Sequence, residues 1–224
     1  MSAEHFREQG YELIPDVISS ADCDAILVNV SQLAMTRAGT RNLLQSRWCK
    51  RLADAFRAHA AIASLLGTST TAVQCTLFEK SAERNWGVSI HQDIGIPVRE
   101  RVDAAECMGW AIKEGVLHTQ PPPHVLARLV ALRLHLDACP TVAGPLRVVP
   151  RSHRIGRLND DDIERLRKIS GEVTCVAERG AVLLMRPLLL HASSRIAGGG
   201  KRRVLHFLFG PPNLPFGLNW HIAV

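Results

Sequence analysis

The sequence predicts one mainly β domain with flanking helices, arranged as a double-sheet jelly roll over residues 1–224. Many short strand-like segments follow one another in the second part of the chain, and the segments with helical periodicity gather before them. Short strands at close spacing, preceded by helices, are typical of a jelly roll buttressed by helices. A hydrophobic content of 46% is ample for the packed core of a chain of 224 residues.

The early part of the chain, residues 19–67, is expected to form the helical buttress. Ser19 or Ser20 is suited to cap a helix that runs to about Met35, because a serine hydroxyl accepts a hydrogen bond from a free amide of the first turn. A second helical region is expected over residues 47–66, where apolar side chains recur at helical spacing.

The jelly-roll core is expected over residues 71–212, after one opening strand. The expected strands cover residues 11–14, 73–79, 88–98, 129–136, 145–149, 172–176, 181–185, 189–192 and 203–209. A short helix over residues 160–169 interrupts them, and the acidic residues of its first turn suit the helix dipole. Residues 99–125 are long for a connection in a compact domain, and long loops often act as lids. We therefore predict a lid loop there; the alternative is a surface excursion packed by Trp110.

The most informative motif is His91-Gln92-Asp93, which lies in the expected strand 88–98. Alternate residues of a strand share a face, so His91 and Asp93 can present an imidazole and a carboxylate to one ion. Apolar side chains occupy the other face of this strand, which argues against a surface turn. A second imidazole at His191 would complete the donor set of non-haem Fe(II) oxygenases. The alternative for His191 is a hydrogen-bonded structural histidine.

An arginine at Arg202 follows His191 by about the length of one strand. Its guanidinium could pair bidentately with a carboxylate that lies beside the metal. Lys201 and Arg203 flank it, so the alternative is an exposed basic turn. The arginine and the three metal-ligating residues together indicate a reaction and not only a bound metal.

Five blocks of the chain occur in an order and at a spacing that are themselves informative. They are residues 10–19, His91-Gln92-Asp93, residues 144–153, His191-Ala192-Ser193 and residues 202–207. In these blocks the chain resembles the phytanoyl-CoA dioxygenase family of iron- and 2-oxoglutarate-dependent oxygenases, and the resemblance covers most of its length. The middle block is similar to the family's G-x-L-x-V-x-P-G-S-H segment, with Arg151 in place of the second glycine.

The resemblance implies a double-stranded β-helix, the cupin-like jelly roll, with His91, Asp93 and His191 as iron ligands. The strands of the two histidines would face each other near one open end of the sandwich. Arg202 would hold the distal carboxylate of 2-oxoglutarate. Arg203 competes for this role, because a slip of one residue reverses the face of a strand.

Three further positions correspond to cosubstrate contacts of the family. Ser193 matches a position whose hydroxyl supports the same carboxylate, and Arg133 falls near a contact that is often tryptophan. Lys80 resembles a lysine that some members use toward the cosubstrate, and the alternative is an ordinary lysine at a strand end.

The resemblance implies Fe(II) as the cofactor, 2-oxoglutarate and O2 as cosubstrates, and succinate and CO2 as products. The carboxylate of Asp93 favours hydroxylation of an unactivated C–H bond, since relatives that halogenate lack it. Three other functions stay open. The protein could be a catalytically silent jelly roll that binds a metal and a small acid, or an oxygenase that acts on nucleic acid or protein. It could also be a zinc or manganese enzyme without cosubstrate, which leaves Arg202 unexplained.

Charge and composition bear on the partners of the protein. A formal charge of +6 favours anionic partners, but the arginines are scattered and aromatic residues make up 5%, so no nucleic-acid interface is expected. The densest basic groups, residues 151–157 and 201–203, border the expected site and suit a small-molecule substrate of anionic character. Five residues are candidate substrate contacts: Trp86, Trp110, His118, Gln120 and His135.

The cysteines and the chain's hydropathy bear on its compartment. The six cysteines are dispersed and form no Cys-x-x-Cys pair, so reduced and mostly buried thiols are expected. No segment approaches the length of a membrane span and no signal peptide is visible, so a cytoplasmic protein without membrane contact is expected. The identity of the substrate and the oligomeric state stay open.

Overall fold

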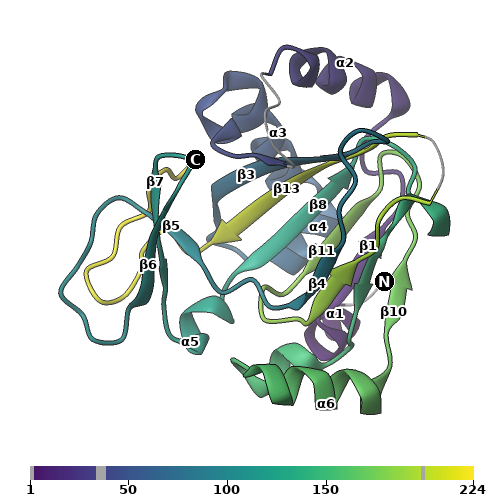
Figure 1. Cartoon of the computed structure of the whole chain (residues 1–224). Helices are drawn as coiled ribbons and strands as arrows, with labels where there is room; N and C mark the ends of the chain where they lie inside the picture. The colour runs from purple at the N-terminus through teal and green to yellow at the C-terminus, as the bar shows by residue number, and fades with distance from the viewer. Residues whose placement is uncertain (1–2, 34–38, 198–199) are drawn as a thin grey trace.

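The computed structural model describes residues 3–33, 39–197 and 200–224, and its core is a sandwich of two antiparallel sheets (Figure 1). The larger sheet contains, in spatial order, β1 (Tyr11–Ile14), β11 (Val182–Met185), β8 (Val130–His135), β13 (Arg202–Gly210), β3 (Thr71–Lys80) and β2 (Gly39–Thr40). The smaller sheet contains β10 (Val173–Cys175), β9 (Leu146–Val148), β12 (His191–Ser193) and β4 (Val88–His91). This arrangement confirms the predicted mainly β jelly roll with flanking helices.

A third sheet stands beside the sandwich, at the left of Figure 1. It contains β5 (Ile96–Val98), β7 (Val116–Gln120) and β6 (Met108–Lys113). The C-terminal segment runs along it, and the amide of Arg99 donates to the carbonyl of Asn219 at 2.9 Å. This sheet closes one side of the cavity described below.

Four helices cover the face of the six-stranded sheet that points away from the four-stranded sheet: α1 (Ala3–Gln9), α2 (Ser20–Ser31), α3 (Arg47–Ala58) and α4 (Ala60–Leu66) (Figure 1). Two further helices, α5 (Pro123–Leu126) and α6 (Asp160–Ser170), lie elsewhere, with α6 at the bottom of Figure 1. Short 3-10 turns occur at Leu43–Gln45, Thr141–Ala143 and Ser152–Ile155. Ser19 caps α2, as predicted, by accepting a hydrogen bond from the amide of Asp22 at 3.1 Å. None of the described helices is long and apolar enough to cross a membrane.

Two helix boundaries differ from the prediction. The helix α2 ends at Ser31, and Met35, the predicted end, lies outside the described residues. The single helix predicted over residues 47–66 is two helices, α3 and α4, because His59 between them has an extended backbone. The apolar spacing continues across this break, so periodicity alone does not reveal it.

Side chains along β13 alternate between the two faces of the six-stranded sheet. Leu205, Phe207 and Phe209 are buried beneath the helices, and the ring centroids of Phe207 and of Phe56 on α3 lie 5.4 Å apart. The residues that face the interior of the sandwich instead include Arg202, His206 and Leu208. One face of the sheet therefore holds the main core, and the other lines a cavity.

The strand predicted over residues 88–98 divides into β4 and β5, which belong to different sheets. The backbone leaves β4 after His91, and the amide of Asp93 donates to the carbonyl of Pro187 at 2.8 Å. The period-two pattern of apolar residues runs through the break, so the sequence predicts one strand where the structure has two.

Residues 99–125 do not form the predicted loop, because most of them belong to the hairpin of β6 and β7 and to α5. The hairpin turns at Glu114 and Gly115, which both have positive φ angles. Strand β6 lies at the edge of its sheet and contains glycine and alanine, residues with little preference for strands, which hid it from the sequence pattern. A role for this segment as a lid remains a prediction.

Candidate active site

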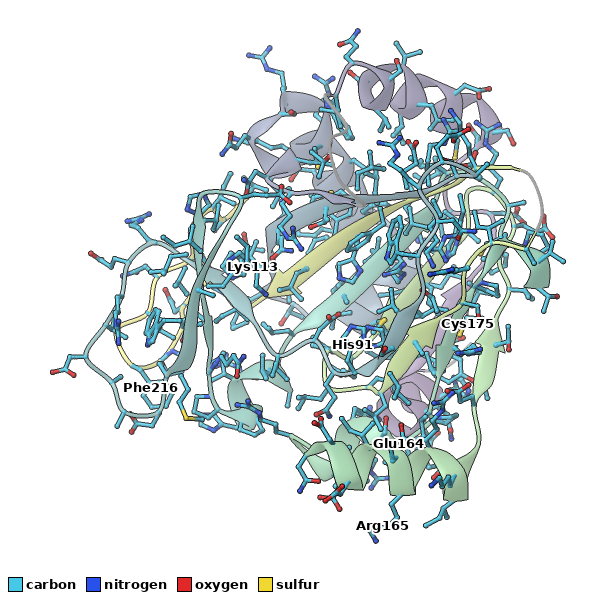
Figure 2. The ribbon with its side chains drawn as sticks, viewed as in Figure 1. His91, Lys113, Glu164, Arg165, Cys175 and Phe216 are labelled. Atoms are coloured by element: carbon cyan, nitrogen blue, oxygen red, sulfur yellow. The ribbon has the colours of Figure 1, made fainter. Side chains whose placement is uncertain are left out.

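Three side chains that could hold a metal ion meet at the edge of the sandwich interior, where Figure 2 labels His91. The ligand atoms of His91, Asp93 and His191 all lie within 4.8 Å of one another. The Nε2 atoms of the two histidines each lie 3.6 Å from a different carboxylate oxygen of Asp93. Two imidazoles and one carboxylate form the donor set that binds non-haem iron on one face and leaves other positions open.

The two histidines come from neighbouring strands, since His191 on β12 pairs directly with His91 on β4. The prediction had the two strands facing each other near one open end of the sandwich; the structure pairs them side by side in the four-stranded sheet. The Nδ1 atoms of His91 and His191 each lie 2.8 Å from a backbone carbonyl two residues earlier, at Ser89 and Leu189. Donation from Nδ1 to these carbonyls fixes the tautomer and turns both Nε2 atoms toward Asp93.

The protonation states of His191 and Asp93 suit metal binding. Burial lowers the pKa of His191 to about 4, against the attraction of Asp93. Burial works to raise the pKa of Asp93, but His191, His91 and His206 outweigh it and hold that pKa well below its ordinary value. A neutral imidazole beside an ionised carboxylate at neutral pH is the form that coordinates a divalent cation.

Three basic side chains are buried next to the metal-ligating residues. Lys80, Arg133 and Arg202 are only 0%, 7% and 3% exposed. Lys80 on β3 stands directly opposite Arg202 on β13, and its ammonium donates to Ser193 Oγ at 3.0 Å and to the carbonyl of Ser194 at 2.6 Å. Burial, together with the charges of Arg202 and Arg133, lowers the pKa of Lys80 to about 7.

Among the described residues, no acidic side chain forms an ion pair with these three cations. Arg133 donates to Nδ1 of His206 at 3.1 Å, and Arg202 donates to the carbonyl of Gly144. The Nε atoms of both arginines are buried without a hydrogen-bond partner. Because buried charge without a counter-ion is costly, the group fits an anionic ligand that carries at least one carboxylate.

The adjacent arginine, Arg203, points to the other side of β13. Its guanidinium forms a bidentate pair with Asp137, with Nε–Oδ2 and Nη2–Oδ1 distances of 2.8 and 2.7 Å. Arg202 lines the cavity and Arg203 does not. Adjacent residues of a strand face opposite sides, so of these two residues only Arg202 faces the cavity that His91, Asp93 and His191 line.

The metal-ligating residues and the three buried cations line one cavity of about 460 Å³. This volume falls within the usual range of small-molecule sites. Of the predicted substrate contacts, Trp86, His118 and Gln120 line the cavity, and the ammonium of Lys80 lies 5.2 Å from the ring centroid of Trp86. Apolar side chains form another part of the lining: Ile94, Ile96, Leu126, Leu129 and Leu208.

Two predicted substrate contacts, Trp110 and His135, do not line the cavity. Trp110 lies on the face of β6 opposite Lys113, and its indole Nε1 donates to the carbonyl of Cys107 at 3.1 Å. His135 lies two residues beyond Arg133 on β8 and is buried outside the cavity, only 2% exposed. Alternation predicts the face of a strand on which a residue lies and not how far the cavity extends along it.

The sequence did not identify two cationic residues of the cavity lining, Arg41 and Lys113. The guanidinium of Arg41 pairs with Glu114 at the hairpin turn, at 2.6 Å. No local motif marks either residue. Lys113 reaches the cavity through the pairing of the hairpin, and Arg41, which follows β2, contacts the turn of that hairpin from the six-stranded sheet.

The fold and the site together define a jelly-roll, non-haem iron oxygenase of the kind that takes a small diacid as cosubstrate. Two imidazoles and a carboxylate fit iron, and the buried cations without an acidic partner fit the diacid. A model of the phytanoyl-CoA dioxygenase family matches residues 6–204, and the chain belongs to this family of iron- and 2-oxoglutarate-dependent oxygenases. A comparison with curated proteins found no match.

Solved structures of similar fold cover nearly the whole chain. The epimerase SnoN, in complex with Fe3+, alpha ketoglutarate and nogalamycin RO, is 16% identical with a TM-score of 0.72, over 96% of this chain and 85% of SnoN. HygX from Streptomyces hygroscopicus, with nickel and 2-oxoglutarate bound, is 18% identical with a TM-score of 0.67, over 96% of this chain and 89% of HygX. EctD from S. alaskensis is 19% identical with a TM-score of 0.67, over 99% of this chain and 82% of EctD. At these identities the likeness shows a common fold.

Proposed function

We propose that this protein is an Fe(II)- and 2-oxoglutarate-dependent dioxygenase that hydroxylates an unactivated C–H bond of a small-molecule metabolite. The observation that carries the proposal is the shared cavity of the metal-ligating residues and the buried cations. Iron and 2-oxoglutarate would supply the oxidising chemistry when bound, with O2 as oxidant and succinate and CO2 as products. His91, Asp93 and His191 would hold the metal on one face and leave the opposite face to ligands.

The cosubstrate would lie between the metal and the buried cations. Arg202 would bind its distal carboxylate through charge-assisted hydrogen bonds, which are stronger than those between neutral groups. Lys80 and Arg133, on the strands β3 and β8 that flank β13, would add positive charge from either side, and Ser193 would accept from Lys80 and orient it. In a site shielded from water these charges act more strongly than they would in solution.

The remaining cavity would receive the substrate. Its apolar lining would hold the carbon skeleton, and Trp86, His118 and Gln120, which line the same cavity, would contact the substrate. The hairpin of β6 and β7 forms the wall on this side and would act as the lid. That SnoN was solved with a small-molecule ligand, nogalamycin RO, supports a substrate of this class.

Two alternatives remain to be tested against this proposal. A cavity of about 460 Å³ with scattered basic residues around it favours a small molecule over nucleic acid or protein. A silent protein that binds a metal and a small acid would use the same metal-ligating residues and cations, so an assay of turnover separates it from the proposed enzyme.

The test is an assay of the Fe(II)-loaded protein under O2 with a panel of small metabolites. We expect 2-oxoglutarate to be converted to succinate, stimulated by some member of the panel, whose product gains one oxygen atom in mass spectrometry. A chelator should abolish the conversion. A protein that binds Fe(II) and 2-oxoglutarate without stimulated turnover would support the silent alternative, and one that binds neither would overturn the proposal.

The pH dependence of 2-oxoglutarate binding tests the role of Lys80. Its pKa of about 7 in the unliganded protein should rise when a carboxylate arrives, so binding takes up a proton above pH 7. The affinity should therefore be constant below pH 7 and fall as pH rises above it, by at most about tenfold per unit. Calorimetry of the Ni(II)-loaded protein in two buffers of different ionisation enthalpy measures how many protons are taken up when 2-oxoglutarate binds. The K80M variant should bind more weakly and without this slope; an unchanged slope would contradict the role.

A further inference from the structure

The charge of the cavity stays positive after iron and 2-oxoglutarate have bound. The two positive charges of Fe(II) and the two negative charges of 2-oxoglutarate cancel, and Asp93 is the one acidic residue among the described residues that line the cavity. The cavity lining also contains four basic residues, the three buried cations and Lys113, whose positive charge exceeds the single negative charge of Asp93. A fifth basic residue, Arg41, is paired with Glu114. A loaded cavity with this surplus attracts a further anion.

Lys113 is the cation of this set that lies away from the cosubstrate group. It is the last residue of β6, and it lies on the side of the hairpin that faces the sandwich (Figure 2). Its ammonium is 3.7 Å from the position that a Cβ atom would occupy at Gly95, two residues after Asp93. Lys113 is exposed at the rim of the cavity, and no described residue forms an ion pair with it.

His118 stands beside Lys113 on the same wall of the cavity. It pairs across the hairpin with Ala111, which places it diagonally from Lys113, within reach of a long side chain. Its Nδ1 lies 3.0 Å from the carbonyl of Val116, so Nδ1 donates and Nε2 is left as an acceptor without a partner among the described residues. The wall thus offers one cation and one neutral acceptor.

We propose that the substrate carries an anionic group, a carboxylate or a phosphate, that binds Lys113, with a hydroxyl or amine nearby that donates to His118. The apolar lining around Ile96 and Leu129 would then hold the carbon skeleton. Lys113 would then make the enzyme prefer anionic substrates over neutral ones. The inference rests on the proposed function, because it assigns the substrate side of the same cavity.

The experiment uses pairs of small metabolites that differ only in charge: a free acid with its carboxamide, and a phosphate ester with its alcohol. Stimulated 2-oxoglutarate consumption is measured for the wild type, for K113E and for K168E. Lys168 is an exposed residue of α6 outside the cavity lining, so K168E makes the same charge change elsewhere. Binding of 2-oxoglutarate to each Ni(II)-loaded variant is measured separately and should stay within about twofold of the wild type, since neither residue belongs to the cosubstrate group.

We expect the anionic member of a stimulating pair to be preferred by the wild type and by K168E, and K113E to reduce this preference by at least about tenfold. The acid and phosphate pairs show which anion the wall accepts. A preference for neutral members, or a preference that K113E leaves intact, would overturn the inference while leaving the proposed function standing. Absence of iron- and 2-oxoglutarate-dependent turnover would instead count against the proposed function.

Competitive labelling decides the matter when no pair stimulates turnover. The Ni(II)- and 2-oxoglutarate-loaded protein is treated with a trace of acetic anhydride, and the labelling of Lys113 and Lys168 is compared by mass spectrometry. Acetate or inorganic phosphate as the added probe should slow the labelling of Lys113 selectively. If the probe slows the labelling of Lys113 no more than the labelling of Lys168 at any concentration, an anion site at Lys113 is refuted.

Discussion

Replacing Asp93 with alanine is expected to weaken Fe(II) binding by about a hundredfold or more and to abolish turnover. The carboxylate is the one anionic donor of the set, and its two oxygens each lie 3.6 Å from a histidine Nε2. Without it, the two imidazoles have no negative charge to offset the metal's desolvation. Titration with Ni(II) under calorimetry, and with Fe(II) under anaerobic conditions, measures the loss.

The D103A variant is the matched control, since it removes one exposed carboxylate outside the cavity. It should bind metal as the wild type does. Asp93 is half-exposed, and the hydrogen bond to Pro187 comes from its backbone amide, so D93A should remain folded. Wild-type metal affinity in folded D93A would show that the two histidines and Asp93 are not a metal site.

The meeting of His91 and Asp93 could be predicted because they are only two residues apart, although Asp93 lies just beyond the end of β4 and not on the predicted single strand. His191 is distant in the sequence, and the order and spacing of the family's blocks pointed to it. The arginine one strand length beyond His191 needed only the geometry of an extended chain. The same geometry separates Arg202 from Arg203 once the strand is placed. The sequence left this choice open, because the partner that occupies Arg203, Asp137, lies on a different part of the chain.

The break in the predicted strand, the hairpin of β6 and β7 and the lining of the cavity depend on contacts between distant segments, which leave no local pattern in the sequence. The break after His91 is stabilised by the carbonyl of Pro187, and the hairpin of β6 and β7 is completed by packing on the sandwich. Lys113 looks like an ordinary surface lysine in the sequence and reaches the cavity only because the hairpin folds back. For the same reason, the sequence could not distinguish Trp110, on the outer face of β6, from a residue of the cavity.

Replacing Arg202 with methionine is expected to weaken 2-oxoglutarate binding roughly a hundredfold, because truncating one partner of a buried charge pair costs about 2–5 kcal/mol. Calorimetry with the Ni(II)-loaded protein measures it. The charges of Arg202 and Arg133 both lower the pKa of Lys80, which shows that the three cations repel one another in the unliganded protein. Removing Arg202 relieves part of this repulsion, so the melting temperature of the unliganded protein should stay unchanged or rise.

The neighbouring substitution, R203M, should give the opposite pair of results. It leaves Asp137 without its bidentate partner, so the melting temperature should fall, while the Kd for 2-oxoglutarate should stay within about twofold of the wild type. The two variants remove the same charge from adjacent positions of β13, and they differ in the face of the strand. If R203M loses 2-oxoglutarate and R202M keeps it, the register of β13 against β3 and β8 is wrong, and the buried cations need another explanation.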